Sequence, residues 1–184
     1  SRASAGVPDP RDPSLKGMAR LQVLIDRIKL EQNKLKTLEA RFVQHQESSL
    51  LAQPEKSTGV LSYAAPDRVR WEYLTPNPIS VLIAGSTMTT WYRDLERAET
   101  IKIGRYSTQV FKYLGASGSM QTLLDYFNVE LHTPSGAEAR TRPFRLDLTP
   151  RYARIAKRMK SMTLWIDGER YVPTKVEVVE GDGD

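Results

Sequence analysis

Few side chains in this sequence could carry out chemistry. None of the 184 residues is a cysteine, which excludes thiolate nucleophiles, disulfides and cysteine metal sites. The two histidines, His45 and His132, are far apart, and neither belongs to an H-x-H or H-x-x-x-H pair that could share a metal ion. We therefore expect both to be half-exposed strand residues, and we expect no metal site and no cofactor.

Three other motifs lack the context that an active site needs. The stretch "GASGS" at 115–119 has neither Walker spacing nor a following Lys-Ser/Thr pair. Ser117 and Ser119 do not fit the G-x-S-x-G pattern of a nucleophile elbow. Glu72 and Asp94 could form a carboxylate pair, but on alternating strands both are most simply solvated residues of an outer face. The sequence therefore predicts no catalytic residues and no enzyme.

Arginine and lysine concentrate between residues 140 and 160. The whole chain has a net charge of only +5, from 27 Lys and Arg against 22 Asp and Glu. Within the basic segment, Phe144 and Tyr152 are the only aromatic residues that could stack on bases, so a nucleic-acid partner is not favoured. Two interpretations remain open: a solvated loop and strand face, or a patch for anionic lipid headgroups, a membrane surface or an acidic protein. The basic residues are Arg140, Arg142, Arg145, Arg151, Arg154, Lys157, Arg158 and Lys160.

The stretch "APDRVRWEYLTP" at 65–76 alternates charged and apolar residues. Strict alternation places Arg68, Arg70 and Glu72 on one sheet face and the intervening Val, Trp and Tyr on the other. Trp71 therefore points at apolar material. Bulky aromatic and methionine side chains suit either an ordinary dry core or a pocket for flexible acyl chains.

One long helix and many strands must position these residues. Asp12 can cap a helix with Pro13 at its first position, and apolar residues at spacings of three and four continue it to near Asn33. A strand follows from Leu38 toward Leu51, and short apolar helices are predicted at 110–114 and 119–127. Further strands are predicted at 60–64, 68–74, 79–84, 87–93, 99–103, 129–132, 144–148, 161–167 and 171–179.

The composition fits one domain. With 40% hydrophobic and 27% charged residues the chain can bury a core, and its longest apolar run, 79–85, is far below the roughly 20 residues that span a bilayer. We expect 1–13 to be a flexible segment and 14–184 a single domain. The start has neither Met nor an apolar signal core, which is typical of a processed or engineered end. The Gly and Asp residues that end "VEVVEGDGD" normally lead into another strand, so we expect the C-terminus to be truncated.

The order of these elements resembles the LolA family of periplasmic lipoprotein carriers, from about Leu15 onward. The most specific element is the Phe-x-Gln strand in "FVQHQ", formed by Phe42 and Gln44. A Pro-x-x-x-x-Trp-x-x-x-x-Pro pattern follows, in which Pro66, Trp71 and Pro76 match. The strands "GVLSY", "SVLIAGSTMTTWYRD", "FRLDLTPR" and "YVPTKVEVVEGDGD" then follow in the family's order.

The resemblance implies an α+β fold that is mainly β. It is an unclosed, curved antiparallel β-barrel with an N-terminal helix and short lid helices over its concave apolar face. In the family this cavity holds the acyl chains of lipoproteins, an inner-membrane ABC transporter loads the carrier, and an outer-membrane receptor empties it. The resemblance thus implies a monomeric carrier in the periplasm of a Gram-negative bacterium, exported with a cleaved signal peptide and without nucleic-acid partners.

The sequence departs from the family pattern at three positions. Ala65 stands where the family usually has an arginine that latches the lid by hydrogen bonds. Either Arg68 or Arg70 provides a polar lid or headgroup contact in its place, or the lid is held differently. Ala84 and Thr89 replace the usual Asp and Trp of the strand at 79–93. The cargo is therefore left open between lipoprotein and another lipid.

We expect the cavity and its lid to be formed by the apolar residues of the concave face and the short helices. A second hypothesis is a lipid-sensing or protein-interaction domain of the cell envelope on the same fold. The predicted ligand-binding residues are Leu38, Phe42, Val69, Trp71, Trp91, Phe111, Leu114, Met120, Leu123, Leu124, Phe127, Leu146, Leu164 and Ile166.

Overall fold

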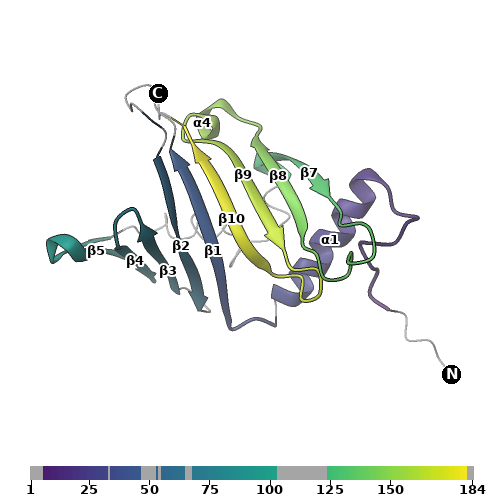
Figure 1. The fold of residues 1–184 in the computed structure, drawn as a ribbon, viewed down its shortest axis with the longest axis horizontal. Helices are drawn as coiled ribbons and strands as arrows, with labels where there is room; N and C mark the ends of the chain where they lie inside the picture. Colours follow the sequence, from purple (N-terminus) through teal and green to yellow (C-terminus); the bar gives the residue numbers. More distant parts are fainter. Residues whose placement is uncertain are drawn as a thin grey trace.

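A single curved sheet forms the scaffold (Figure 1). The computed structural model describes residues 6–32, 34–46, 53, 55–64, 68–102 and 124–181. Its ten strands lie in the order β6-β5-β4-β3-β2-β1-β10-β9-β8-β7. They are β1 (Thr37–Gln46), β2 (Glu55–Ala64), β3 (Arg68–Thr75), β4 (Ile79–Ala84), β5 (Thr87–Tyr92), β6 (Arg97–Lys102), β7 (Phe127–His132), β8 (Phe144–Pro150), β9 (Met159–Ile166) and β10 (Pro173–Glu180).

The expected unclosed curved fold is confirmed, with one correction to its strand directions. All neighbouring strands are antiparallel except β1 and β10, which run parallel from the pair Arg41–Lys175 to the pair Gln46–Glu180. The sheet is therefore mixed. A parallel pair cannot be joined by a tight hairpin, and here nearly the whole chain forms the connection.

Alternation along the strands separates a concave from a convex face, as predicted for 68–73. In β3, Val69 is fully buried, whereas Arg68 and Arg70 are exposed. Val69 lies opposite Ile83 of β4, which is also buried, and Trp71 lies opposite Val81. Buried apolar residues thus gather on the concave face and charged residues on the convex one.

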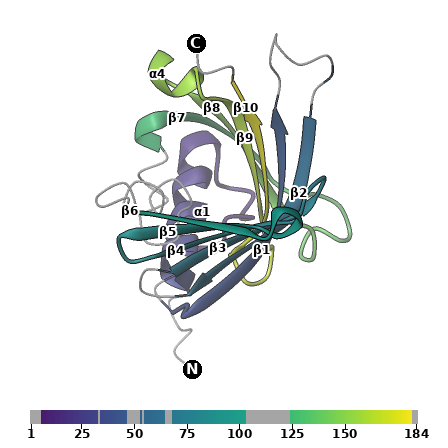
Figure 2. The same ribbon diagram turned by 90° about the vertical axis from the view of Figure 1, so that its left-hand side faces the viewer.

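Helix α1 (Gly17–Gln32) lies inside the curve of the sheet (Figure 2). Leu21, Leu24, Ile25 and Ile28 recur at helical spacing, and all four are buried in the main core. The helix begins later than the predicted Asp12, because that side chain closes a turn of its own. Its Oδ1 accepts hydrogen bonds from the Ser14 backbone nitrogen at 2.9 Å and Oγ at 2.8 Å.

The approach to α1 is fixed at Pro10 and Arg11, within the stretch expected to be flexible. Pro10 is buried, and the Arg11 guanidinium donates to the Tyr171 hydroxyl at 2.9 Å and to the Gly168 carbonyl at 2.5 Å. The same guanidinium stacks over Phe144, 4.8 Å from the ring centroid. Residues 10 and 11 are therefore part of the packed structure.

Other element boundaries differ from the sequence prediction. Phe127 begins β7, whereas the prediction placed it in a lid helix, and only residues 124–126 of that helix are helical and described. The sequence also did not indicate the short helix α4 (Ala153–Ala156) or the 3-10 turn η1 (Arg93–Leu95). No helix among the described residues is long and apolar enough to cross a membrane.

Candidate ligand-binding site

The candidate site is the concave face of the sheet. Cross-strand pairing brings Phe42, Val176, Leu164 and Leu146 into one row across β1, β10, β9 and β8. All four are buried, and they share a core with the apolar residues of α1. A continuous apolar surface therefore extends across the middle of the sheet.

A small apolar cavity lies within this face. Its volume is about 30 Å³, and it is lined by residues of β1, β2, β3, β9 and β10, including Leu38, Leu61, Val69 and Leu164. A cavity needs roughly 10–15 Å³ to hold one water molecule, whereas ligand pockets measure roughly 300–1,000 Å³. An acyl chain can therefore enter only if the surrounding elements move apart.

A wider cleft adjoins this cavity where β1 begins and β2 ends. Its volume is about 790 Å³, which falls within the usual range of ligand sites. Leu38, Tyr63, Val69 and Pro173 line both the cleft and the cavity. These shared residues make the cleft the natural entrance to the apolar interior.

The cleft wall is rich in arginine. Arg68, Arg70 and Arg170 line it together with Glu39 and Asp167. All three arginines are exposed, and within the described ranges neither Arg68 nor Arg170 forms a salt bridge. The cleft therefore combines an apolar floor with exposed cationic groups. That Arg68 or Arg70 contacts a lid or a headgroup remains a prediction.

The aromatic residue of the Phe-x-Gln motif is fitted against a glycine. The Phe42 ring packs edge-on against Tyr73, with centroids 5.1 Å apart and ring planes at 80°. A Cβ atom at Gly59 would lie 2.6 Å from the Phe42 ring and 2.0 Å from the Glu72 carbonyl oxygen. Only glycine fits beneath this ring.

The glutamine of the motif adds polar groups to one end of the concave face. The Tyr73 hydroxyl donates to Gln44 Oε1 at 2.9 Å, and Gln44 Nε2 in turn donates to Glu180 Oε1. Burial raises the pKa of Tyr73, and the nearby Glu180 carboxylate raises it further. Tyr73 is therefore held as a neutral phenol, and the chain of bonds joins β3, β1 and β10.

Most of the described residues predicted for the site lie on the concave side. Alternation and register place Phe42, Val69, Trp71, Leu146, Leu164 and Ile166 there, with Phe127 fully buried at the start of β7 and Leu124 packed against the core. Leu38, Val69 and Leu164 line the cavity directly. That these side chains contact a ligand remains a prediction.

Trp91 is a correction, because it lies on the convex face. It pairs with Ser80, which pairs with Glu72 in the next strand, and half of its surface is exposed. The Arg93 guanidinium lies 5.4 Å from the Trp91 ring centroid and donates to Glu72 at 3.2 Å. The predicted alternation was displaced by one residue in this strand, and the parity of β5 turns Met88 and Thr90 toward the concave face instead.

Several predicted residues lie outside the described residues. They include Ala65 at the family's usual latch position and four residues assigned to the lid, namely Phe111, Leu114, Met120 and Leu123.

The sequence prediction omitted residues that line the cavity or the cleft. Alternation with Trp71 could have identified Leu61 and Tyr63, since β2 pairs with β3 in register. Arg170 lies in the turn before β10, outside every predicted strand. Val172 lies in the predicted strand 171–179, which begins later, at Pro173, and it was not assigned to the site. Pro173 and Val176 share the concave face only because the register shifts between Pro173 and Lys175.

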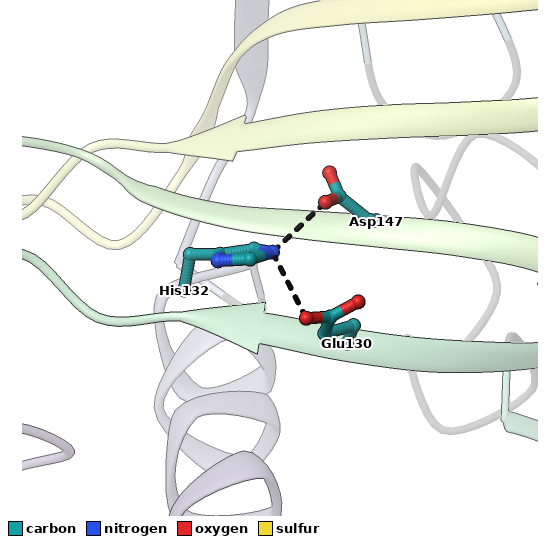
Figure 3. A group of neighbouring side chains, drawn as sticks. All are labelled: Glu130, His132 and Asp147. Carbon is teal, nitrogen blue, oxygen red and sulfur yellow. Dashed lines mark hydrogen bonds and ion pairs between the residues drawn. The ribbon is translucent and has the colours of Figure 1, made fainter.

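One group of side chains has the composition of a metal site (Figure 3). His132 Nε2 lies 2.9 Å from Asp147 Oδ2 and 3.6 Å from Glu130 Oε1 on the convex face of β7 and β8. The three could offer one nitrogen and two carboxylate oxygens to a cation. Arg145 already lies 3.2 Å from Asp147 Oδ1 and neutralises it. Contacts among these side chains explain the arrangement without a metal ion. The expectation that the chain has no metal site remains a prediction.

Comparison with known proteins gives one family. The family model described as "Outer membrane lipoprotein carrier protein LolA" matches residues 33–184. No curated protein is similar enough to this chain to count as a match.

The solved structures that match this chain include two with low similarity scores. One is a chain from the structure of the CwlD amidase from Clostridioides difficile in complex with the GerS lipoprotein, with 12% identity and a TM-score of 0.39 over 91% of this chain and 89% of that chain. The other is a putative outer membrane lipoprotein-sorting protein domain from Vibrio parahaemolyticus, with 11% identity and a TM-score of 0.35 over 85% of this chain and 71% of that chain.

Proposed function

Because this chain belongs to the LolA family of outer membrane lipoprotein carriers, we propose that it carries acyl chains between the two membranes of a Gram-negative envelope. The cargo is a lipoprotein or a related lipid. A soluble periplasmic carrier of this kind takes its cargo from an inner-membrane ABC transporter and delivers it to an outer-membrane receptor. It acts as a monomer and makes or breaks no covalent bond in its cargo.

The observation that carries the proposal is the apolar cavity connected to a cleft with a cationic wall. Leu38 and Val69 line both spaces, so an acyl chain that enters the cleft meets apolar surface continuously. Burying apolar surface away from water is worth about 25 cal/mol per Å², so this surface can shield an acyl chain from water between the two membranes. Arg68, Arg70 and Arg170 suit the polar part of the same molecule.

The small volume of the cavity, about 30 Å³, shapes the proposed mechanism. An acyl chain must open the interior of the protein as it enters. The free energy that this opening costs reduces the free energy gained by burying the acyl chain. The resulting intermediate affinity suits a carrier, because it must release its cargo to a receptor that binds the same chains more tightly.

The proposal is tested by measuring the mass of any ligand that co-purifies with the protein. Native mass spectrometry of protein purified from detergent-free cells should show a co-purified lipid or lipopeptide. The carrier function would be refuted if the purified protein never contained a lipid and also failed to bind a fluorescent fatty-acyl ligand. Stable binding to an envelope protein without any cargo handover would favour the sensing or interaction domain instead.

Two tryptophans provide a matched pair for the binding assay. Trp71→Lys places a charge on the concave face and should weaken fatty-acyl binding more than about tenfold. Trp91→Lys makes the same change on the exposed convex face and should leave affinity unchanged. Leu38→Glu, at a half-buried position lining cavity and cleft, repeats the test if Trp71→Lys does not fold. Equal affinity of all variants would rule out this face as the binding site.

A further inference from the structure

The end of the sheet opposite the cleft carries a basic projection, which we define as residues 151–160, "RYARIAKRMK". It contains five Arg and Lys residues and no Asp or Glu. It includes α4, which lies between the end of β8 and the start of β9 in Figure 1 and extends beyond the sheet in Figure 2. All five basic residues are exposed.

The described structure leaves most of these charges uncompensated. Arg151, Arg154, Lys157 and Arg158 form no salt bridge with any described carboxylate. Arg151 Nε donates to the Phe127 carbonyl at 3.1 Å, which holds the projection to β7. The Gly181 nitrogen donates to the Arg158 carbonyl at 2.9 Å, and this bond holds the other end of the projection to the residue that follows β10. The charges therefore sit on a fixed support.

An exposed aromatic ring lies among the charges. Tyr152 is half exposed, packs edge-on against Tyr126 with centroids 6.4 Å apart, and lies 5.9 Å from the Arg154 guanidinium carbon. Tyrosine favours the boundary between water and lipid, where its ring and hydroxyl are both accommodated. On the inner side of the turn, Ile155 packs against the core, so the outward side is left to Tyr152 and the cations.

We propose that the basic projection docks this protein onto the surface of a bilayer that contains anionic lipid. Clusters of four to eight Arg and Lys residues next to an interfacial element bind anionic headgroups by Coulomb attraction. A convex tip with an aromatic residue fits a planar lipid surface better than it fits the groove of an acidic protein. The docking is peripheral and reversible, since five charges and one ring do not insert a helix.

The projection and the cleft lie at opposite ends of β9, which runs from Met159 beside α4 to Ile166. Seven strand steps separate these residues, a length of about 23 Å. A membrane bound at the projection therefore leaves the cleft free to receive or release a ligand. Docking and acyl binding are consequently separate properties, and either can fail without the other.

Co-sedimentation of the full chain with lipid vesicles tests the proposal. The protein should bind vesicles of phosphatidylcholine mixed with phosphatidylglycerol but not vesicles of phosphatidylcholine alone. At about 1 M salt, where charges are screened beyond roughly 3 Å, binding should disappear. Failure to bind the anionic vesicles at low salt would overturn the proposal.

The decisive variant combines Arg154→Gln, Lys157→Gln and Arg158→Gln. It should lower the vesicle partition coefficient on the order of 100-fold, since each basic residue near the surface contributes roughly fivefold. Arg151 is retained because it binds the Phe127 carbonyl. Tyr152→Ser should weaken binding further, while fatty-acyl affinity stays that of the native chain in both variants.

A matched control removes the same number of charges elsewhere. Lys16, Lys36 and Arg41 are exposed and lie before α1, before β1 and within β1. Their triple substitution by Gln should leave vesicle binding within about twofold of the native chain. Equal loss in both triple variants would show that only net charge matters and would refute a defined docking surface.

Discussion

At the scale of single residues, Gln44 has the clearest structural role in the family motif. Its amide accepts from Tyr73 of β3 and donates to Glu180 of β10, so one side chain links three strands on the concave face. Polar groups in a largely apolar site are stable only when they are bonded in this way. The motif thus holds three strands together on the concave face, and Phe42 in the same motif supplies apolar surface.

Tyr73→Phe should reduce the loss of stability at high pH. The pKa of Tyr73 is raised in the folded chain, so above its ordinary value of 10.0 the unfolded chain loses this proton first. Stability from this group is therefore complete below pH 10 and declines as pH rises through the folded pKa. Urea unfolding at neutral and alkaline pH should show a smaller decline in the free energy of unfolding for the variant than for the native chain. At neutral pH the variant should be less stable by about 0.5–1.5 kcal/mol, because it lacks the hydrogen bond to Gln44.

Gln44→Leu is the control for this titration. It removes the hydrogen bond but keeps the buried phenol and its desolvation, so the alkaline decline should persist. An identical pH dependence in Tyr73→Phe and the native chain would contradict the assignment to Tyr73.

At the scale of elements, alternation in the sequence predicted the meander well. The predicted 79–84 matches β4, and the predicted 68–74 and 144–148 fall within β3 and β8. The face on which a strand residue lies is a local property, because a strand with one buried face alternates apolar and polar residues along its own sequence. The face of Trp71 could therefore be inferred from its own strand, whereas that of Trp91 was wrong because a shift of one residue moves a side chain to the opposite face.

The remaining errors concern interactions between distant residues. No local pattern shows that β1 pairs with β10 in parallel, since their partners are more than 100 positions apart, as in Phe42 with Val176. The start of α1 moved to Gly17 because the Asp12 carboxylate bonds to Ser14 in a separate turn. The cleft combines the ends of β1, β2 and β3 with the turn before β10, so only the folded sheet assembles it.

Helix α1 should contribute strongly to stability through its buried face. Leu24→Ala removes a side chain with no exposed surface and should lower the free energy of unfolding by about 2–5 kcal/mol. Met18→Ala on the same helix removes a residue that is 65% exposed and should change it by less than about 0.5 kcal/mol. Urea denaturation followed by circular dichroism provides both values. Similar small effects would mean that α1 contributes little packing to the sheet.

At the scale of the whole molecule, β10 joins two parts of the chain into one sheet. Strands β1 to β6 come from residues 37–102, strands β7 to β9 come from 127–166, and β10 alone lies between them. The core cluster also crosses this boundary, from Phe42 and Val69 to Phe144 and Ile166. We therefore expect the chain to unfold in one cooperative transition despite the length of its sheet.

Val176→Asp tests this cooperativity at the junction. Val176 lies buried between Phe42 and Leu164, so a carboxylate there should cost about 3–5 kcal/mol and destabilise both parts together. Val179→Asp makes the same change on the convex side of β10, opposite His45, and should cost less than about 1 kcal/mol. Hydrogen exchange would follow amides of β3 and of β8 separately in both variants. If Val176→Asp lowered protection in one of these strands and left the other at its native level, the two parts would be independent folding units. Parallel losses in β3 and β8 would show that the two parts of the sheet fold and unfold as one structure.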